Sequence, residues 1–288
     1  MKRIQLFDEH ILEAIGRSRI VVQDGRVVTV SPPLITDCPL AKRFAFPVDE
    51  MTDEAVRKNI ENRIASFGMC TRNRDIYDDT DFVGFGASEL ISNGILSGIL
   101  DCAIIACDGA GTVIVTDPRM VQGIGGRMSG LVKTTPYSEV VMKIECGGGR
   151  VLDQKTGLLD PAAGVHLAKK WGYTRPAVTV ATAHDAEAVR RTASDVLIIG
   201  VHTTGISKED AVVMNSTCDI ITGCASSQVR DISAKDACLQ AGTTVPVFAM
   251  TKEGKRLIIQ RITDITYPLM ITRATLPVSG EKVPHPLI

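Results

Sequence analysis

Several features common in nucleic-acid-binding and membrane proteins are missing from this chain. Aromatic residues make up only 4% of the 288 residues, and Trp171 is the single tryptophan, so there are few stacking surfaces for single-stranded nucleic acid. The formal net charge is -1, from 32 basic and 33 acidic residues, which favours binding neither to nucleic acid nor to an anionic membrane surface. No apolar stretch reaches the roughly 18 residues that a transmembrane helix needs. We therefore expect no nucleic-acid partner and no membrane partner.

Local motifs for metals, nucleotides and secretion are missing as well. The first 16 residues carry charges among their apolar positions, unlike the hydrophobic core of a signal peptide. Eight cysteines without such a signal indicate a reducing compartment, so we expect a cytoplasmic protein with free thiols. None of these cysteines belongs to a CxxC pair, and the chain has no GxxxxGK[ST] motif. A metal or nucleotide site would have to be assembled from distant segments.

The first 86 residues are interpreted as a smaller α+β region. Residues 7–15 are predicted to form an amphipathic helix. Asp24 and Gly25 join two alternating apolar stretches, which indicates a β-hairpin. Thr52 is a candidate N-cap for a helix over residues 53–67, which ends shortly before Cys70.

Residues 87–275 have the pattern of an α/β core. A helical segment over 87–100 leads into the apolar run 102–107, and further apolar runs cover 177–183, 195–202, 218–224 and 245–251. Helical segments over 184–193, 208–216 and 226–242 separate these runs. The pattern predicts a doubly wound, mostly parallel, Rossmann-like sheet covered on both faces, followed by an extended tail over 276–288. Because right-handed crossovers bring the carboxyl ends of parallel strands to one edge, residues there are placed to form a site.

A glycine-rich insertion over residues 108–150 interrupts this core. Such a density of glycine allows backbone N–H groups to approach an anion or a cofactor closely. The candidate cofactor-binding residues are Asp108, Gly109, Gly111, Gly125, Gly126, Arg127, Thr203 and Thr204. Tight turns, a solvated arginine and helix caps are the alternative interpretation of the same residues.

Cys107, His202 and Cys224 each stand at the end of a predicted strand. Cys224 is the candidate nucleophile, because a helix that begins at residue 226 or 227 would point its N-terminus at the thiol. His202 is the candidate general acid or base, and His184 occupies a similar position. Histidine is also an acceptable cap or loop residue. Three other cysteines are interpreted as core residues, namely Cys102, Cys218 and Cys238.

Six stretches of the chain resemble the methanogenesis marker 8 proteins of methanogenic archaea. They are FGMCT at 67–71, FVGFGASE at 82–89, CDGAGTVI at 107–114, QGIGGRMSGLVKTTP at 122–136, VHTTGIS at 201–207 and ITGCAS at 221–226. The resemblance extends over almost the whole chain and implies an anaerobic archaeal cytoplasm. It also favours an iron–sulfur cluster as a cofactor. If a metal or cluster is bound, we expect its ligands to be Cys70, Cys107 and Cys224, with Cys38 as the fourth.

Three functions are weighed at this point, and the first is favoured. The resemblance implies an accessory protein for the assembly, modification or activation of methyl-coenzyme M reductase, so that enzyme or its assembly factors would be the partner. The second is an enzyme that acts on a small anionic metabolite with Cys224 or His202. The third is a noncatalytic subunit that binds a partner, and a homo-oligomer is compatible with each of the three.

Overall fold

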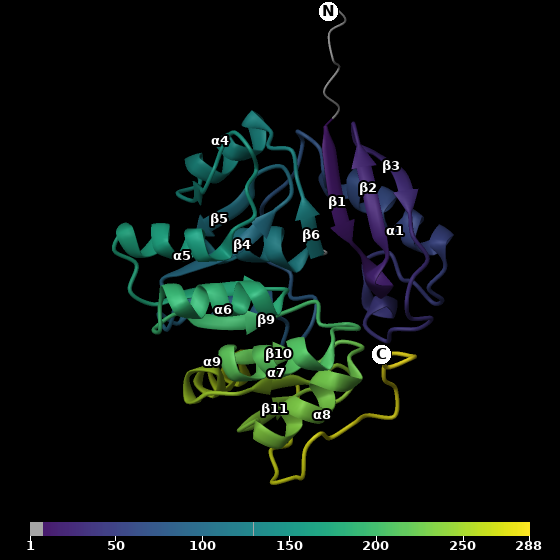
Figure 1. Cartoon of the computed structure of the whole chain (residues 1–288), viewed down its shortest axis with the longest axis vertical. Helices are drawn as coiled ribbons and strands as arrows, with labels where there is room; N and C mark the ends of the chain where they lie inside the picture. Colours follow the sequence, from purple (N-terminus) through teal and green to yellow (C-terminus); the bar gives the residue numbers. More distant parts are fainter. Residues whose placement is uncertain (1–7, 129) are drawn as a thin grey trace, which may run out of the picture.

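The computed structural model describes residues 8–128 and 130–288, and its first unit is a small antiparallel sheet. The strands β1 (Glu9–Glu13), β2 (Arg19–Gln23), β3 (Arg26–Val30) and β6 (Gly130–Lys133) pair in the order β3-β2-β1-β6 (Figure 1). The hairpin expected at Asp24 and Gly25 joins β2 to β3, and both residues have positive φ, 47° and 70°. β6 belongs to the glycine-rich insertion, so this sheet combines two segments distant in sequence.

The helix predicted over residues 7–15 is wrong. Residue 7 lies outside the described residues, and residues 9–13 form β1, in which His10 and Leu12 are buried and their neighbours are not. This alternation is the two-residue period of a strand. Pairing with β2 on one side and β6 on the other satisfies the backbone of β1, which outweighs the weak helical pattern of five residues.

Helix α1 (Asp53–Phe67) covers the small sheet and confirms the predicted helix. Thr52 caps it, because its Oγ1 accepts a hydrogen bond of 3.1 Å from the N–H of Ala55. Val56 and Ile60 pack against Leu12 and Ile20 of the sheet. Gly68, with a φ of 71°, ends the helix and directs the chain towards Cys70.

The second unit is a large mixed sheet of eight strands. Its order is β11-β12-β10-β9-β8-β4-β5-β7. The strands are β4 (Cys102–Cys107), β5 (Gly111–Val115), β7 (Arg150–Val151), β8 (Pro176–Val180), β9 (Leu197–Gly200), β10 (Ile220–Thr222), β11 (Leu239–Ala241) and β12 (Val247–Ala249). The central strands β4, β8, β9 and β10 are parallel, whereas the four outer pairings are antiparallel.

The structure therefore confirms a mixed α/β fold but not a doubly wound, mostly parallel sheet. The parallel strands follow one another in a single direction, from β4 to β10, without the reversal of order that defines a doubly wound sheet. Residues 239–241, expected within a helix, form β11. Strands β5 and β7 were not expected within the glycine-rich insertion, where a tight hairpin after β4 returns the chain antiparallel.

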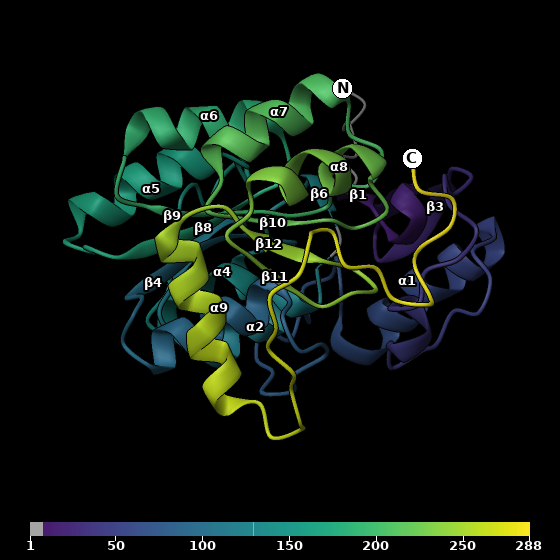
Figure 2. The same cartoon turned by 90° about the horizontal axis from the view of Figure 1, so that it is seen from below.

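Helices nevertheless cover both faces of the large sheet (Figure 2). The crossover helices lie on one face and are α5 (Pro161–Lys170), α6 (Ala183–Thr192), α7 (Lys208–Thr217) and α8 (Ser227–Asp236). The opposite face carries α2 (Ala87–Leu96), α4 (Ser138–Cys146) and α9 (Lys252–Asp264). Each layer has its own apolar core, in which the sheet contributes Ile198 and Ile221 to the first and Ile199 and Ile220 to the second.

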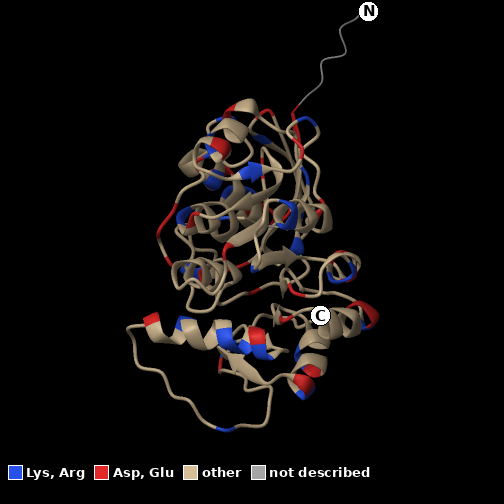
Figure 3. Cartoon of the chain, turned by 90° about the vertical axis from the view of Figure 1, so that its left-hand side faces the viewer, with Lys and Arg blue, Asp and Glu red and all other residues tan. Residues whose placement is uncertain are grey.

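The remaining regular elements are short. They comprise α3 (Pro118–Val121), a π-helical turn at Gln122–Gly126 and 3-10 turns at Ile15–Arg17 and Ala41–Arg43. After α9 the described chain has no further helix or strand, and it returns across the molecule to an isolated bridge between Asp37 and His285. The helices in residues 8–128 and 130–288 include none with the length and hydrophobicity to span a membrane. Basic and acidic residues are interspersed in the view of Figure 3.

Candidate functional site

A cavity of about 680 Å³ lies at the carboxyl ends of the parallel strands. Strand β8 contributes Thr179 and Val180, and the residues that follow β9 and β10 contribute His202 and Cys224. This is the edge at which a sheet of parallel strands places its ligand-binding loops. Two of the three residues singled out at strand ends in the sequence therefore line one cavity.

His202 and Cys224 share an uncommon backbone conformation. Their φ values are 56° and 40°, in the left-handed region that residues other than glycine, asparagine and aspartate seldom adopt. Each residue lies two positions after the last residue of its strand. The left-handed backbone there turns both loops towards the same cavity. Such backbone strain persists where the surrounding structure enforces it, and it clusters at functional sites.

Hydrogen bonds between the two loops hold this arrangement. Thr203 Oγ1 donates to the carbonyl of Thr222 at 2.6 Å, and the N–H of Ala225 donates to Thr204 Oγ1 at 3.3 Å. The hydroxyl of Thr222 donates to the Gly200 carbonyl at 3.1 Å. Because that hydroxyl has a single hydrogen, the thiol of Cys224, 3.5 Å from Thr222 Oγ1, is the donor in their contact. Thr203 and Thr204, expected to bind a cofactor, join the two loops in this structure.

The His202 imidazole is neutral at physiological pH. The His202 side chain is exposed to the cavity, but protein atoms surround the ring. The resulting loss of hydration lowers the pKa of the imidazole to about 4, and the positive charge of Arg63 lowers it as well. A neutral imidazole can accept a proton or a hydrogen bond from a bound ligand. His202 therefore has the protonation state of a general base at neutral pH.

A smaller cavity of about 270 Å³ adjoins the first, and His202 and Cys224 line both. Cys38 and Arg63 also line the smaller cavity. Burial lowers the pKa of Arg63 to about 10, so its guanidinium stays cationic at neutral pH. The guanidinium lies 5.4 Å from the centre of the Phe44 ring, which lines both cavities. The two cavities therefore share the Cys224 thiol and the His202 imidazole, and the Arg63 cation lies on the side of the smaller cavity.

The wall of the large cavity is otherwise mostly apolar. Its side chains come from the loop before α2, from the glycine-rich insertion and from the segment after α9, and they include Phe82, Phe85, Met128, Leu131, Tyr267 and Leu269. Gly125 and Gly126 line it as well, at the end of a π-helical turn, a distortion often found at functional sites. A cavity of this size and character suits a small molecule with a substantial apolar part.

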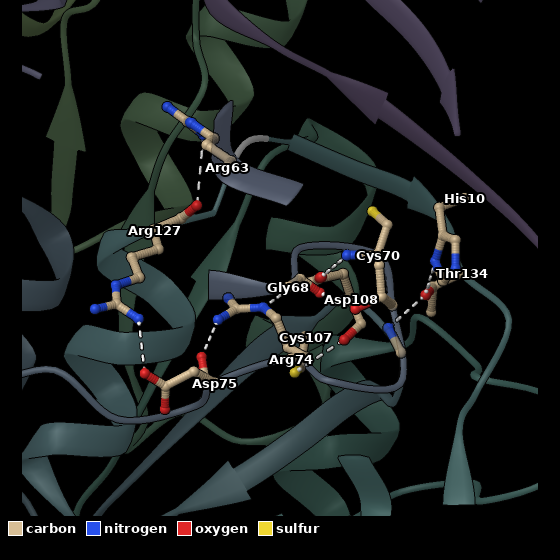
Figure 4. A network of polar contacts seen from close by, with 12 residues as sticks. His10, Arg63, Gly68, Cys70, Arg74, Asp75, Cys107, Asp108, Arg127 and Thr134 are labelled. Atoms are coloured by element: carbon tan, nitrogen blue, oxygen red, sulfur yellow. Dashed lines mark hydrogen bonds and ion pairs between the residues drawn. The ribbon is translucent and has the colours of Figure 1, made fainter. Parts of the chain in front are cut away.

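Cys107 belongs to a different place, a buried polar network shown in Figure 4. Its side chain is 0% exposed and, like Cys70, it lines neither cavity described above. Burial raises the pKa of both thiols well above the usual range. In this network Asp108 accepts hydrogen bonds from Arg74 Nε at 2.9 Å and from the N–H of Cys70 at 2.6 Å. Cys70, Cys107 and Asp108 therefore connect the loop after α1 to the end of β4.

The other proposed binding residues are also engaged in structure. Gly109 donates its N–H to Thr134 Oγ1 at 2.7 Å, and a side chain at Gly111 would meet the Gly157 carbonyl carbon at 2.5 Å. Gly109 lies in the tight turn between β4 and β5, and Gly111 is the first residue of β5. Arg127 forms ion pairs with Asp75 at 3.4 Å and with Asp78 at 2.5 Å. In this structure Gly109 and Gly111 shape the hairpin and Arg127 is paired with two carboxylates instead of being solvated, whereas Gly125 and Gly126 line the cavity.

The four cysteines expected as metal ligands do not meet. Cys70 and Cys107 lie in the buried network, and Cys38 and Cys224 line the smaller cavity. Within residues 8–128 and 130–288, no group of three or more His, Cys, Asp or Glu side chains could hold a metal ion. An iron–sulfur cluster takes four ligands, commonly cysteine thiolates, so the donor set of the described residues does not fit one.

The structure also separates the remaining candidates. Cys102 and Cys218 are buried as expected, whereas Cys238 is exposed, which corrects its assignment to the core. The side chain of His184 is 84% exposed. Arg63, on the inner side of α1, was missed because a helical arginine carries no local signal of its direction.

Comparison with known proteins agrees with an archaeal origin. A family model described as "Uncharacterized protein conserved in archaea (DUF2099)" matches residues 10–263. The Uncharacterized protein MJ0054 of Methanocaldococcus jannaschii is 38% identical over 284 residues, which cover 98% of this chain and 100% of that protein. No solved structure matches the chain. The family match spans both sheets and the loops that carry His202 and Cys224.

Proposed function

We propose that this chain, which belongs to the archaeal DUF2099 family, is an enzyme that acts on a small molecule through the thiol of Cys224. The observation that carries the proposal is the convergence of Cys224 and His202, both in the left-handed backbone region, on one cavity of about 680 Å³. Cys224 is the nucleophile and forms a covalent intermediate with the substrate. His202, neutral at pH 7, accepts the proton that the reaction releases.

The surroundings of this pair restrict the substrate. The apolar wall of the large cavity favours a molecule with a hydrocarbon or ring portion, and Arg63 favours a negative charge in the smaller cavity. Cys224 also precedes the N-terminus of α8, where Ser226 Oγ accepts a hydrogen bond of 3.2 Å from the N–H of Val229. The positive end of this helix adds to the attraction of an anionic substrate.

The test compares variants of the two residues on the full chain. Reduced protein is incubated with a small-molecule extract of methanogen cells, and untargeted mass spectrometry follows the compounds that it consumes. Cys224→Ala should abolish consumption, and His202→Asn should slow it by about 10²- to 10⁴-fold, the usual contribution of a general acid or base. Cys238→Ala, at an exposed thiol between α8 and β11, is the matched control. Unchanged consumption by Cys224→Ala would overturn the proposal.

A second candidate function rests on the organism of the relative. MJ0054 comes from a methanogen and matches the chain along its full length, which is compatible with the methanogenesis marker 8 resemblance and with service to methyl-coenzyme M reductase. That family name, the cytoplasmic location and the reductase partner stay predictions. Purification of an N-terminally tagged chain from methanogen cells tests the role. Reductase subunits should be enriched relative to an untagged strain, and their absence would count against it.

A further inference from the structure

Cys38 and Cys224 approach one cavity from segments that are far apart in the sequence. Both thiols are partly buried, and both line the cavity of about 270 Å³. Cys38 packs against an apolar cluster that includes Ala225, the residue after Cys224. Cys224 also lines the large cavity, so its sulfur can be approached from either space.

The last four residues of the chain connect the two cysteine-bearing segments. At one end His285 exchanges backbone hydrogen bonds with Asp37, at 3.1 and 2.9 Å. At the other end the N–H of Ile288 donates to the carbonyl of Ala225 at 2.9 Å. The anchored residues are therefore the immediate neighbours of Cys38 and Cys224, and only three residue steps, roughly 10 Å of chain, separate their contacts.

A buried cation, Arg230, holds the loop that carries Cys224. Arg230 is 4% exposed, and its guanidinium donates to the carbonyls of Cys224 and Thr244 at 2.8 and 2.9 Å. Among the described residues its Nε has no hydrogen-bond partner. Burial lowers the pKa of Arg230, and the thiols of Cys224 and Cys38 act in the opposite direction. Arg230 therefore holds the loop that carries Cys224 through its backbone carbonyl and keeps a positive charge within electrostatic reach of both thiols.

We propose that Cys38 and Cys224 form a dithiol pair that reduces disulfide substrates, with Cys224 as the attacking thiol and Cys38 as the resolving thiol. This inference rests on the proposed function and names its substrate class. The Cys224 thiolate attacks a substrate R–S–S–R′ in the large cavity, which forms a Cys224–S–S–R mixed disulfide and releases R′S⁻. The Cys38 thiolate then attacks the Cys224 sulfur, which forms the Cys38–Cys224 disulfide and releases RS⁻.

The two steps balance without a metal or an additional cofactor. Two cysteine thiols lose two electrons and two protons, and R–S–S–R′ gains them to become RSH and R′SH. His202 accepts the proton of Cys224, and an external thiol reductant of the cell regenerates the dithiol by the same exchange in reverse. Burial raises the pKa of Cys38, although the N–H groups of Ala41 and Leu40 lower it. The resolving thiol therefore enters the second step protonated, and the R′S⁻ released in the first step accepts its proton.

The experiment uses bis(2-hydroxyethyl) disulfide as the probe. The background is the full chain with Cys146→Ser and Cys238→Ser, which removes the two exposed thiols. The protein is reduced, freed of reductant and mixed with the probe. Released mercaptoethanol is counted, and non-reducing peptide mapping identifies the disulfides. We expect release of two mercaptoethanol molecules per chain and a Cys38–Cys224 disulfide.

Two variants resolve the steps. With Cys38→Ser, or Cys38→Ala if the first folds poorly, the reaction should stop at the mixed disulfide on Cys224 and release one mercaptoethanol. With Cys224→Ser, Cys38 should remain a free thiol. Circular dichroism verifies that each variant is folded.

The outcomes separate this inference from the proposed function. If the Cys146→Ser, Cys238→Ser protein, which still has Cys38, also stops at the mixed disulfide on Cys224, the dithiol pair is refuted. Cys224 then remains the proposed nucleophile. A Cys224 that does not react with the probe while the protein stays folded would overturn both. A disulfide between Cys224 and a cysteine other than Cys38 would also refute the assignment.

Discussion

The buried ion pair between Arg74 and Asp108 makes the stability of the fold depend strongly on one charged contact. Both side chains are 0% exposed and lie 2.9 Å apart. Arg74→Met keeps much of the side-chain volume but removes the guanidinium. The Asp108 carboxylate then stays in the interior and retains the N–H of Cys70, 2.6 Å away, as a donor.

The size of the effect follows from this burial. Removing one partner of a buried ion pair costs about 3–5 kcal/mol, because it leaves an uncompensated charge away from water. Arg74→Met also removes a cation–π contact with Phe67, whose ring centre lies 4.8 Å from the guanidinium. A typical domain has a free energy of unfolding of about 5–15 kcal/mol. We therefore expect the variant to lose about a fifth or more of its stability.

Urea denaturation at pH 7 measures this loss as a change in the free energy of unfolding. Arg72→Met is the matched control, because the ion pair of Arg72 with Glu139 is exposed to solvent and should contribute far less to stability than the buried pair. Adding Asp108→Asn to Arg74→Met removes the stranded charge and keeps an acceptor for Cys70, so it should restore about 1 kcal/mol or more. A loss below about 1 kcal/mol for Arg74→Met, or no gain from the second substitution, would refute the reasoning.

Two further predictions concern pH and backbone packing. Because the pKa of His202 is lowered from 6.5 to about 4, the unfolded chain takes up a proton first as the pH falls. The free energy of unfolding should therefore decrease between pH 6.5 and 4, and His202→Asn should reduce that decrease in urea titrations whereas His184→Asn should not; equal slopes would contradict this. Gly123→Ala would place a Cβ 2.3 Å from the backbone oxygen of Ile76, so it should cost about 1–3 kcal/mol. Gly125→Ala, whose nearest contact is 3.6 Å, should cost less than about 1 kcal/mol in the same denaturation assay, and similar losses for the two would disprove the steric argument.

The sequence predicted the large sheet well where local pattern and tertiary environment agree. The apolar, β-branched runs that became β8, β9 and β10 are buried on both faces, so no solvent-exposed side interrupts their pattern. The prediction for residues 9–13 failed because the pattern of five residues fits a strand and a helix alike. The strand conformation is determined by the two partner strands, one of them more than a hundred residues away.

The candidate site also depends on tertiary contacts that the local sequence does not reveal. Cys107 and Cys224 have the same local signature, a cysteine at the end of an apolar strand, but different surroundings. After β10 the chain enters a loop and a helix, which leaves the strand end open to the cavity. After β4 it turns back at once into β5, and the loop after α1 closes over the turn through Asp108 and Arg74. The element that follows a strand, and what covers it, decides whether its last residue is accessible.

The contacts of residues 285–288 have a consequence for biosynthesis. The segment near residue 37 and the loop near residue 225 are joined through these four residues, which are synthesised after both. The backbone hydrogen bonds of residues 285–288 with both segments can therefore form only after the whole of the large sheet has been synthesised.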